Sequence, residues 1–233
     1  MASKKYIIDG IGEITVYKRR GSRRMNLRIV GNQIRVTQPL WLPYAAGVQF
    51  AQGNQVWVQQ QRQKLPTQAV EHGMAIGKER TLVFESAPAL RTRITTTHII
   101  VYVPHGSTTD SEAVQRAAIA AIKRALKKEA EATLPKRLAY AAEKYDFSYR
   151  TVHCKSMRTR WGSCNSSKEI TLNIFLMMVP WELIDYVLIH ELAHTKHMHH
   201  GDDFWSEVAA VVPDYKERRK QLKIIQHLIA HLQ

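Results

Sequence analysis

The pattern of hydrophobic and polar positions changes character along the chain. Residues 5–38 run apolar or alternate in short segments separated by glycine-containing turns, which predicts β-strands. One helix is expected from about Tyr44 to Lys64, after two prolines that bracket its entry. Further apolar segments at residues 81–86 and 98–104 predict a second group of strands. We therefore expect residues 1–108 to form a β-rich N-terminal region with one helix.

Helical spacing takes over after residue 108. Thr109 and Glu112 have the spacing of a capping box, a hydroxyl followed three residues later by a glutamate. Apolar side chains then recur every three or four residues, in an alanine-rich segment that runs to about Tyr145. This pattern predicts a long pair of helices that connects the β-rich region to the last third of the chain.

The last third mixes strands and helices. Strands are expected at residues 151–157 and 169–176. Three helices are expected to begin at Pro180, Asp203 and Tyr215. Because these elements do not alternate in a strict βαβ rhythm, the sequence predicts an α+β fold, with residues 109–233 forming the helical connection and a C-terminal domain.

Basic residues dominate the charge of the chain. The formal net charge is +14, and the excess lies in the first two thirds, whereas residues 151–233 are nearly balanced. A basic surface attracts polyanions such as nucleic acid or nucleotides, although a solvated basic face that confers solubility is the plainer interpretation. The densest cluster consists of Lys18, Arg19, Arg20, Arg23 and Arg24. It motivates a nucleic-acid hypothesis, but aromatic residues are sparse around it and no recognisable nucleic-acid motif accompanies it.

The two cysteines and the absence of long apolar runs bear on location. Cys154 and Cys164 form no CxxC pair, no apolar run is long enough to span a membrane, and the first residues lack a secretory pattern. We therefore expect reduced thiols in a cytoplasmic protein without membrane contact, with a disulfide between the two cysteines as the less favoured alternative.

A histidine-rich segment at residues 189–205 contains the candidate metal-binding and catalytic residues. His190 and His194 are four residues apart on an expected apolar helix, so both imidazoles project from one face and can reach one zinc ion. Glu191 completes an HExxH motif, in which the glutamate acts as general base in metal-assisted hydrolysis. The alternative is a chance grouping on a helix. The clear helix start and the further histidines after the motif favour the metal site.

A catalytic zinc site needs a third protein ligand and one open position. The candidates are His197, His199, His200, Asp202, Asp203 and Glu207. A rise of 1.5 Å per residue places His197 about 10 Å along the helix from His190, which is too far for one ion. The third ligand should therefore follow the helix, with His200 favoured and His199 as the competitor. The metzincin signature is excluded, because His197 stands at its glycine position and no Met-turn follows.

Five blocks of sequence together resemble one family. They are RTRWGSC (158–164), ITLNIFLMMVP (170–180), DYVLIHELAH (185–194), HHGDDFW (199–205) and PDY (213–215). In this order they resemble the YgjP-like metal-dependent hydrolases, which are related to SprT-like and minimal zincin metallopeptidases. The resemblance implies a zincin-like C-terminal catalytic core with His190, His194 and His200 as zinc ligands and Glu191 as the catalytic acid/base. Where the family usually has Asn-His-Ser, this chain has His199-His200-Gly201, which keeps His199 open as an alternative ligand.

Other residues near the motif are candidates for supporting roles. The candidates for substrate binding are Arg158, Arg160, Ser163 and Asn173. The arginines could meet a carboxylate or phosphate, or could form ordinary surface salt bridges. Asn173 lies on an expected strand whose edge could pair with an extended peptide. Phe204 and Trp205 are expected to anchor the loop that carries His200.

The HExxH motif indicates which reaction is catalysed, but it does not indicate which substrate is hydrolysed. A zinc-dependent metallopeptidase is the favoured hypothesis. The second is a nucleoside-triphosphate pyrophosphohydrolase, because some members of the resembled family are described as acting on UTP; without a Walker loop, phosphate binding would depend on Arg158, Arg160 and the N-terminal basic residues. The third is a DNA-associated SprT-like protein. Zinc is the expected cofactor, although nickel, cobalt or copper also suit three imidazoles.

Overall fold

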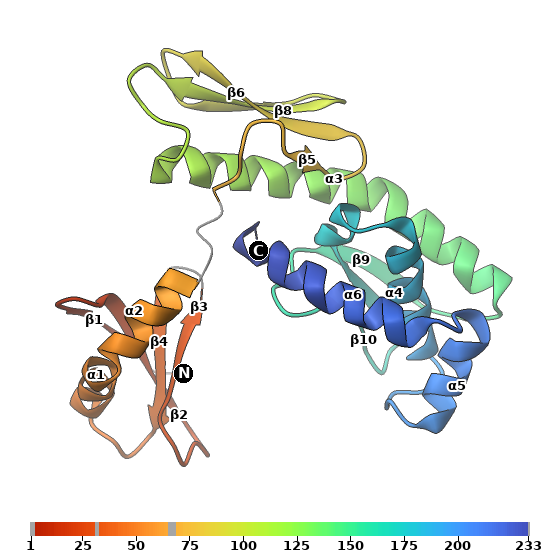
Figure 1. Cartoon of the computed structure of the whole chain (residues 1–233). Helices are drawn as coiled ribbons and strands as arrows, with labels where there is room; N and C mark the ends of the chain where they lie inside the picture. Colours follow the sequence, from red (N-terminus) through yellow and green to blue (C-terminus); the bar gives the residue numbers. More distant parts are fainter. Residues whose placement is uncertain (1–2, 31–32, 65–68, 233) are drawn as a thin grey trace. The chain divides into compact units, whose positions relative to one another are not determined.

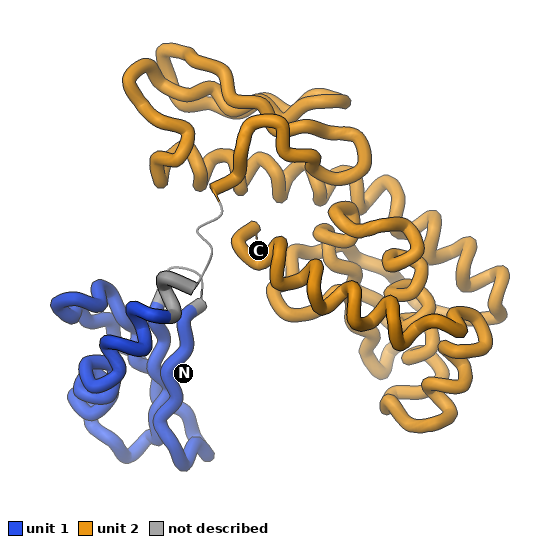
Figure 2. The backbone as a smooth tube through the Cα atoms, in the orientation of Figure 1, with its two compact units in different colours: residues 1–68 blue, residues 69–233 orange. Residues whose placement is uncertain are grey.

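The computed structural model describes residues 3–30, 33–64 and 69–232, and the chain divides into two units, residues 1–68 and 69–233 (Figure 2). Each unit has its own hydrophobic core. The division into compact units falls between residues 68 and 69, whereas the sequence pattern predicts a domain boundary between 108 and 109. The physical reason is that the strands between residues 75 and 104 belong to the larger unit, where they pack against its long helix.

Unit 1 is a mixed four-stranded sheet with two helices. Its strands, in the sheet order β1-β2-β4-β3, are β1 (Ser3–Ile8), β2 (Gly12–Arg19), β4 (Gln33–Pro39) and β3 (Asn26–Val30). The outer pairs are antiparallel, whereas β2 and β4 run parallel. Alternate residues Ile14, Val16, Ile34 and Val36 are fully buried, as strand periodicity requires for a sheet with one covered face.

The helical segment of unit 1 is broken into α1 (Tyr44–Gly53) and α2 (Gln55–Lys64), where the sequence pattern predicts one helix. The break is at Asn54, whose backbone has φ −107° and ψ 19°. The Asn54 side-chain amide donates to the Phe50 carbonyl at 2.7 Å. An asparagine that competes for backbone acceptors in this way favours the end of a helix over its interior.

Unit 2 contains a four-stranded sheet that lies against the long helix α3 (Glu112–Lys144) (Figure 1). In sheet order the strands are β5 (Ala75–Ile76), β6 (Arg80–Ala87), β8 (His98–Pro104) and β7 (Arg91–Ile94). The expected strands at residues 81–86 and 98–104 are thus confirmed. Their buried side chains, among them Leu82, Ile99 and Val101, pack with the buried face of α3.

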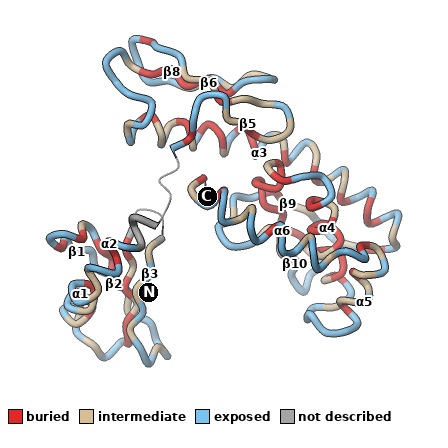
Figure 3. Tube along the Cα trace, viewed as in Figure 1, coloured by how far each residue is buried: buried red, intermediate tan, exposed pale blue. Residues whose placement is uncertain are grey.

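The connection between the two parts of unit 2 is one helix of 33 residues, not the expected pair. It begins after Ser111, so Thr109 is not its N-cap, and Pro135 lies inside it. Buried residues recur along one face of the helix through Ile122, Leu126 and Leu134 (Figure 3). Because α3 is about 50 Å long, its first half packs on β7 and β8 while its second half packs on the C-terminal elements.

The C-terminal elements begin with a three-stranded sheet and continue as helices. In sheet order the strands are β10 (Gly162–Cys164), β11 (Glu169–Asn173) and β9 (Thr151–Lys155). The helices are η1 (Ile174–Met178), α4 (Trp181–Ala193), α5 (Asp202–Val211), α6 (Tyr215–Leu228) and η2 (Ala230–Leu232). The α+β class is confirmed.

Two further expectations concern the thiols and the helices. Cys154 and Cys164 are free thiols. Among the helices of the described residues, none combines the length and the apolar character that a membrane crossing requires.

Candidate active site

Three histidines converge at the end of α4. His190 lies in its last turn, His194 follows as its C-cap, and His200 comes from the loop before α5. The Nε2 atoms of His190 and His200 are 3.2 Å apart, and the rings of His194 and His200 have centroids 4.7 Å apart. One potential ligand atom from each residue lies within 4.8 Å of the others. Within the described part of the chain, this is the group of metal-ligating side chains that can share one ion.

The competing histidines lie outside this cluster. His197 contributes its backbone carbonyl, which accepts a hydrogen bond from Nδ1 of His194 at 3.0 Å, and its ring nitrogen lies 3.8 Å from Glu207. His199 is exposed and is not part of the group. The geometry therefore favours His200 over His199 as a third potential ligand.

Two aromatic residues hold the loop that carries His200. Phe204 is fully buried, and its ring centroid lies 4.9, 4.5 and 4.7 Å from those of His190, His194 and His200. Trp205 stacks on the His200 ring at 5.4 Å and donates its indole N–H to the His200 carbonyl at 3.1 Å. The two side chains thus fix both the backbone and the ring of His200, as expected from the sequence.

The three imidazoles are held in the neutral form that metal ligation needs. Burial lowers the pKa of His190 to about 3, and burial also lowers the pKa values of His194 and His200. Because Nδ1 of His194 faces the carbonyl of His197, its Nε2 keeps a free lone pair. Three neutral imidazoles that converge in this way suit a divalent transition metal, zinc above all.

Glu191 is a buried carboxyl group beside this cluster. Its residue is only 4% exposed, and its Oε2 has no hydrogen-bond partner among the residues that the structure describes. Burial raises the pKa of Glu191 to about 8, although the nearby Arg160 opposes the rise. A buried carboxyl oxygen without a protein partner is costly. The residues present therefore fit a divalent cation, whose charge would offset that cost.

Gly162 on β10 makes room for Glu191. A Cβ atom at this position would lie 2.5 Å from Oε1 of Glu191 and 2.6 Å from its Cγ, closer than carbon and oxygen atoms approach without bonding. Only a glycine can pass the carboxylate at this distance. β10 and α4 thus approach each other closely where Gly162 faces Glu191.

A cleft of about 980 Å³ opens onto the cluster. It is lined by Thr159, Arg160, Trp161, Gly162, Ser163, Cys164, Tyr186, Val187, His190, Glu191, His194, Met198, His200, Trp205, Arg219, Leu222, Lys223 and Gln226. The walls therefore come from β10 and the segment before it, from α4, from the loop after α4 and from α6. Since β10 pairs only with β11 in its sheet, the strand in the cleft wall is an edge strand.

The predicted substrate residues have different positions. Arg160 and Ser163 line the cleft, whereas Arg158 does not, and its carbonyl accepts a hydrogen bond from the side chain of Gln226 on α6 at 3.4 Å. Arg158 is thus placed to connect the segment before β10 to α6. Substrate binding by Arg160 and Ser163 stays a prediction.

Asn173 lies outside the cleft lining. It is 1% exposed on the central strand β11, and its amide donates to the carbonyls of Met157 and Arg160 at 2.8 and 2.7 Å. Its Oδ1 accepts from the backbone N–H groups of Met157 and Phe175. These bonds occupy the amide, so Asn173 holds the segment that carries Arg160. The edge strand expected at Asn173 is instead β10.

The wall formed by α6 was not foreseen from the sequence. Arg219, Lys223 and Gln226 line the cleft, and the guanidinium of Arg219 lies 5.4 Å from the ring centroid of Trp205. Their spacing of four and three residues places them on one helical face. That spacing is visible in the sequence, but only the packing of α6 reveals that this face borders the histidine cluster.

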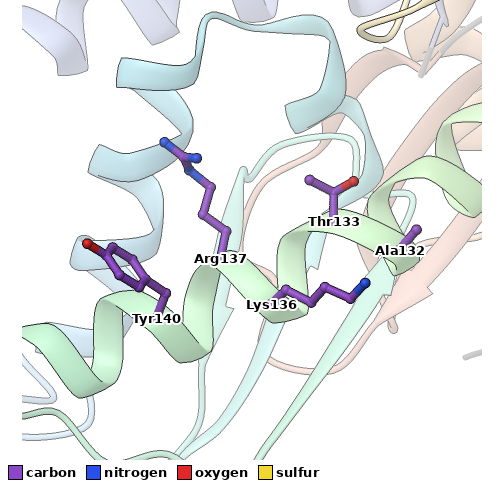
Figure 4. Close-up of a pocket in the computed structure, with 5 residues that line it drawn as sticks. All are labelled: Ala132, Thr133, Lys136, Arg137 and Tyr140. Atoms are coloured by element: carbon purple, nitrogen blue, oxygen red, sulfur yellow. The ribbon is translucent and has the colours of Figure 1, made fainter.

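A second, smaller hollow of about 400 Å³ lies on α3 (Figure 4). It is lined by Ala132, Thr133, Lys136, Arg137 and Tyr140. Arg137 is engaged with α4, since its Nη2 lies 2.7 Å from Oδ2 of Asp185. The lining has no histidine, cysteine or carboxylate, and it therefore offers no metal site.

The chain is similar to known metallopeptidases. A family model described as the YgjP-like metallopeptidase domain matches residues 23–224. The chain belongs to the YgjP-like family. Membership makes this YgjP-like protein a metal-dependent hydrolase, in agreement with the histidine cluster.

Two solved structures are similar to part of the YgjP-like chain. One is the metallopeptidase zymogen of Pyrococcus abyssi abylysin, with 26% identity and a TM-score of 0.36 over 39% of this chain and 91% of that one. The other is the metallopeptidase zymogen of Methanocaldococcus jannaschii jannalysin, with 26% identity and a TM-score of 0.34 over 40% of this chain and 93% of that one. No curated protein matches the chain.

Proposed function

We propose that this YgjP-like protein is a zinc-dependent metallopeptidase. His190, His194 and His200 would hold the zinc ion, and Glu191 would act as the general acid and base. The observation that carries the proposal is the juxtaposition of three converging neutral imidazoles with a buried, unpartnered carboxyl group at the wall of an open cleft. A merely structural zinc site would use a fourth protein ligand and would not need the cleft.

Each catalytic residue has a separate task. A zinc ion held by the three histidines would act as a Lewis acid that polarises the scissile carbonyl and lowers the pKa of water. Glu191 accepts a proton from the attacking water and delivers it to the leaving amine. Burial raises the pKa of Glu191, and a nearby divalent cation would oppose this rise, so the same carboxyl group could accept and then donate a proton near neutral pH. Gly162 keeps the approach to the carboxylate open.

The substrate would lie along β10. An exposed strand edge binds an extended peptide through main-chain hydrogen bonds, and Gly162, Ser163 and Cys164 of this edge strand line the cleft. Arg160 lies in the segment just before the strand and would contact an acidic group of the substrate. The peptide would then pass between the edge strand and α6.

Metal analysis combined with a peptidase assay tests the proposal. We expect His190→Ala, His194→Ala and His200→Ala each to lose stoichiometric zinc, while the matched control His199→Ala keeps it. Glu191→Gln should retain zinc but lose hydrolysis of an unfolded protein substrate by roughly a thousandfold or more. Zinc retention in the His200→Ala variant, or normal turnover by Glu191→Gln, would contradict the assignment.

One observation favours a second candidate, a nucleoside-triphosphate pyrophosphohydrolase. Arg160, Arg219 and Lys223 line the cleft, and Glu191 is the one acidic residue among the described lining residues. Guanidinium and ammonium groups bind phosphate well. Release of pyrophosphate from UTP that disappears in Glu191→Gln would establish this activity, whereas hydrolysis of unfolded protein alone would exclude it.

A further inference from the structure

One end of the unit 1 sheet gathers basic and aromatic residues. β2 and β4 run parallel with Arg19 opposite Pro39, so both strands leave the sheet at the same end. The segment after β2 contains Arg20, Arg23 and Arg24, and the segment after β4 begins with Leu40 and Trp41. We call residues 18–24 together with 40–41 the basic end.

The charge of the basic end is not neutralised by the protein. Arg19, Arg20, Arg23 and Arg24 are all exposed, and none of them forms an ion pair with an acidic side chain among the described residues. Lys18 is held at the surface, where its Nζ donates to the Leu40 carbonyl at 3.1 Å. This bond ties the two segments of the basic end together.

Acidic residues are confined to the opposite end of the same sheet. Asp9 and Glu13 are the acidic residues of the first 70 positions. Asp9 lies in the turn between β1 and β2, and Glu13 lies at the start of β2, where it pairs with Lys5 at 2.9 Å. Since β2 ends at the basic end, the charge of unit 1 is separated along the strand direction. A solvated face that served only solubility would not require this separation.

An exposed aromatic side chain accompanies the cations. Trp41 is 77% exposed and the neighbouring Leu40 is 48% exposed. An exposed indole beside cationic side chains can stack against a flat partner such as an unpaired base. The indole and the guanidinium groups therefore offer two kinds of contact at one end of one sheet.

We propose that the basic end of unit 1 binds single-stranded nucleic acid. The arginines would contact successive phosphates, and an unpaired base would stack on Trp41, the combination that binds single strands without reading their sequence. An acidic protein would use the arginines but would not need the exposed indole, and a duplex would keep its bases unavailable for stacking. The inference is independent of the peptidase proposal, because no residue of the basic end belongs to the cleft.

Fluorescence anisotropy of a labelled oligodeoxythymidine titrated with the full-length protein tests the inference. With four phosphate contacts, the logarithm of the affinity should fall with the logarithm of salt concentration with a slope of about −3. Replacing Arg19, Arg20, Arg23 and Arg24 together by Gln should weaken binding by roughly a hundredfold and remove most of this slope. Trp41→Ala should weaken binding by about tenfold and leave the slope unchanged.

A variant with equal loss of charge elsewhere is the matched control. Four exposed basic residues of α3 can be changed to Gln together: Arg116, Lys127, Lys128 and Lys136. This control should bind as the unchanged protein does, and circular dichroism should confirm that both quadruple variants are folded. The inference is overturned if binding is insensitive to salt, if the α3 variant loses as much affinity, if Trp41→Ala binds normally, or if a duplex or polyglutamate competes as well as unlabelled oligodeoxythymidine.

Discussion

At the scale of single residues, the site depends on the space around Glu191. The side chain of Glu191 is buried against β10, and a Cβ atom at Gly162 would meet three atoms of this side chain. The imidazoles next to it are oriented by Phe204 and Trp205. Zinc binding and proton transfer are therefore supported by different neighbours and can be perturbed separately.

Gly162→Ala should separate the two tasks. The methyl group must displace the Glu191 carboxylate, and a displacement of about 1 Å can reduce turnover by about a hundredfold, whereas the zinc ligands stay in place. We expect kcat to fall and zinc content to remain unchanged. Gly201→Ala is the control, because a Cβ atom there meets nothing within 4 Å although Gly201 follows His200 directly. Equal losses in both variants would disprove the steric argument.

The stability of the metal-free protein should depend on pH through His190. Its pKa in the folded protein is about 3, below the ordinary value of 6.5, so its contribution to stability is complete above pH 6.5 and is lost as the pH falls toward 3. For one such group the loss between pH 7 and pH 4 is roughly 3 kcal/mol. Thermal unfolding in EDTA should therefore show a steeper acid dependence for the unchanged protein than for His190→Gln. Identical pH profiles would contradict this prediction.

Part of this site could be predicted because its residues are close to one another in the sequence. His190, Glu191 and His194 follow from helical spacing alone, and the aromatic pair after His200 was correctly expected to anchor its loop. The function of Asn173 could not be inferred in this way. Its amide bonds to a segment some 13 and 16 positions earlier, and that partner becomes visible only when the chain is folded.

At the scale of elements, α3 holds the two parts of unit 2 together. Glu129 on α3 accepts from the backbone N–H of Lys78 at 2.7 Å and pairs with Arg80 at 2.8 Å, with both charged side chains mostly buried. The Lys78 side chain in turn donates to the Val179 carbonyl and lies over the ring of Trp181, at the start of α4. The turn before β6 thus connects α3 to the helix that carries the HExxH motif.

Glu129→Ala should destabilise the protein strongly. Removing the carboxylate leaves the buried charge of Arg80 without its partner, which costs about 3 kcal/mol. Chemical denaturation should show this loss. Glu131→Ala provides the comparison, since this exposed residue forms a surface pair with Lys127 at 3.7 Å and should change the free energy of unfolding by less than about 0.5 kcal/mol. A small effect at Glu129 would exclude a joining role for this pair.

The sequence pattern predicts that most of the helices and strands exist and which type each one is. It does not predict where a helix is interrupted or where it continues. Asn54 ends α1 through a side-chain hydrogen bond that hydrophobic spacing does not encode. Conversely, α3 continues through Pro135, although a proline inside a helix costs about 3 kcal/mol relative to alanine. Leu134 and Leu138 are fully buried on either side of it, so tertiary packing compensates for the local penalty.

At the scale of the whole molecule, two separate cores imply two separate unfolding events. The core of unit 1 contains residues such as Ile34 and Val58, while the core of unit 2 extends from Val70 to Leu232. The strands before residue 68 and those between residues 75 and 104 have the same hydrophobic pattern, so the sequence predicts that they belong to one region. The packing of β7 and β8 on α3, which places the later strands in unit 2, is a long-range contact that periodicity does not reveal.

Calorimetry should therefore resolve two transitions in the full-length chain. Ile34→Ala removes a fully buried side chain from the core of unit 1 and should lower only one transition, by the equivalent of about 2–5 kcal/mol. Chelation of zinc should lower only the other, because a ligand stabilises the unit that binds it. One cooperative transition that both treatments shift equally would show instead that the units unfold together.

The origin of the cleft walls has a consequence for how such an enzyme can diversify. The histidines proposed to hold the metal come from α4 and the segment after it, whereas Arg219, Lys223 and Gln226 come from α6. Substitutions at Lys223 and Gln226 would then alter which substrates the proposed enzyme accepts, whereas Arg219 also contacts the ring of Trp205, which holds the loop of His200. A new substrate preference would then require only a few exchanged side chains on one helix, while the histidines and Glu191 stay unchanged.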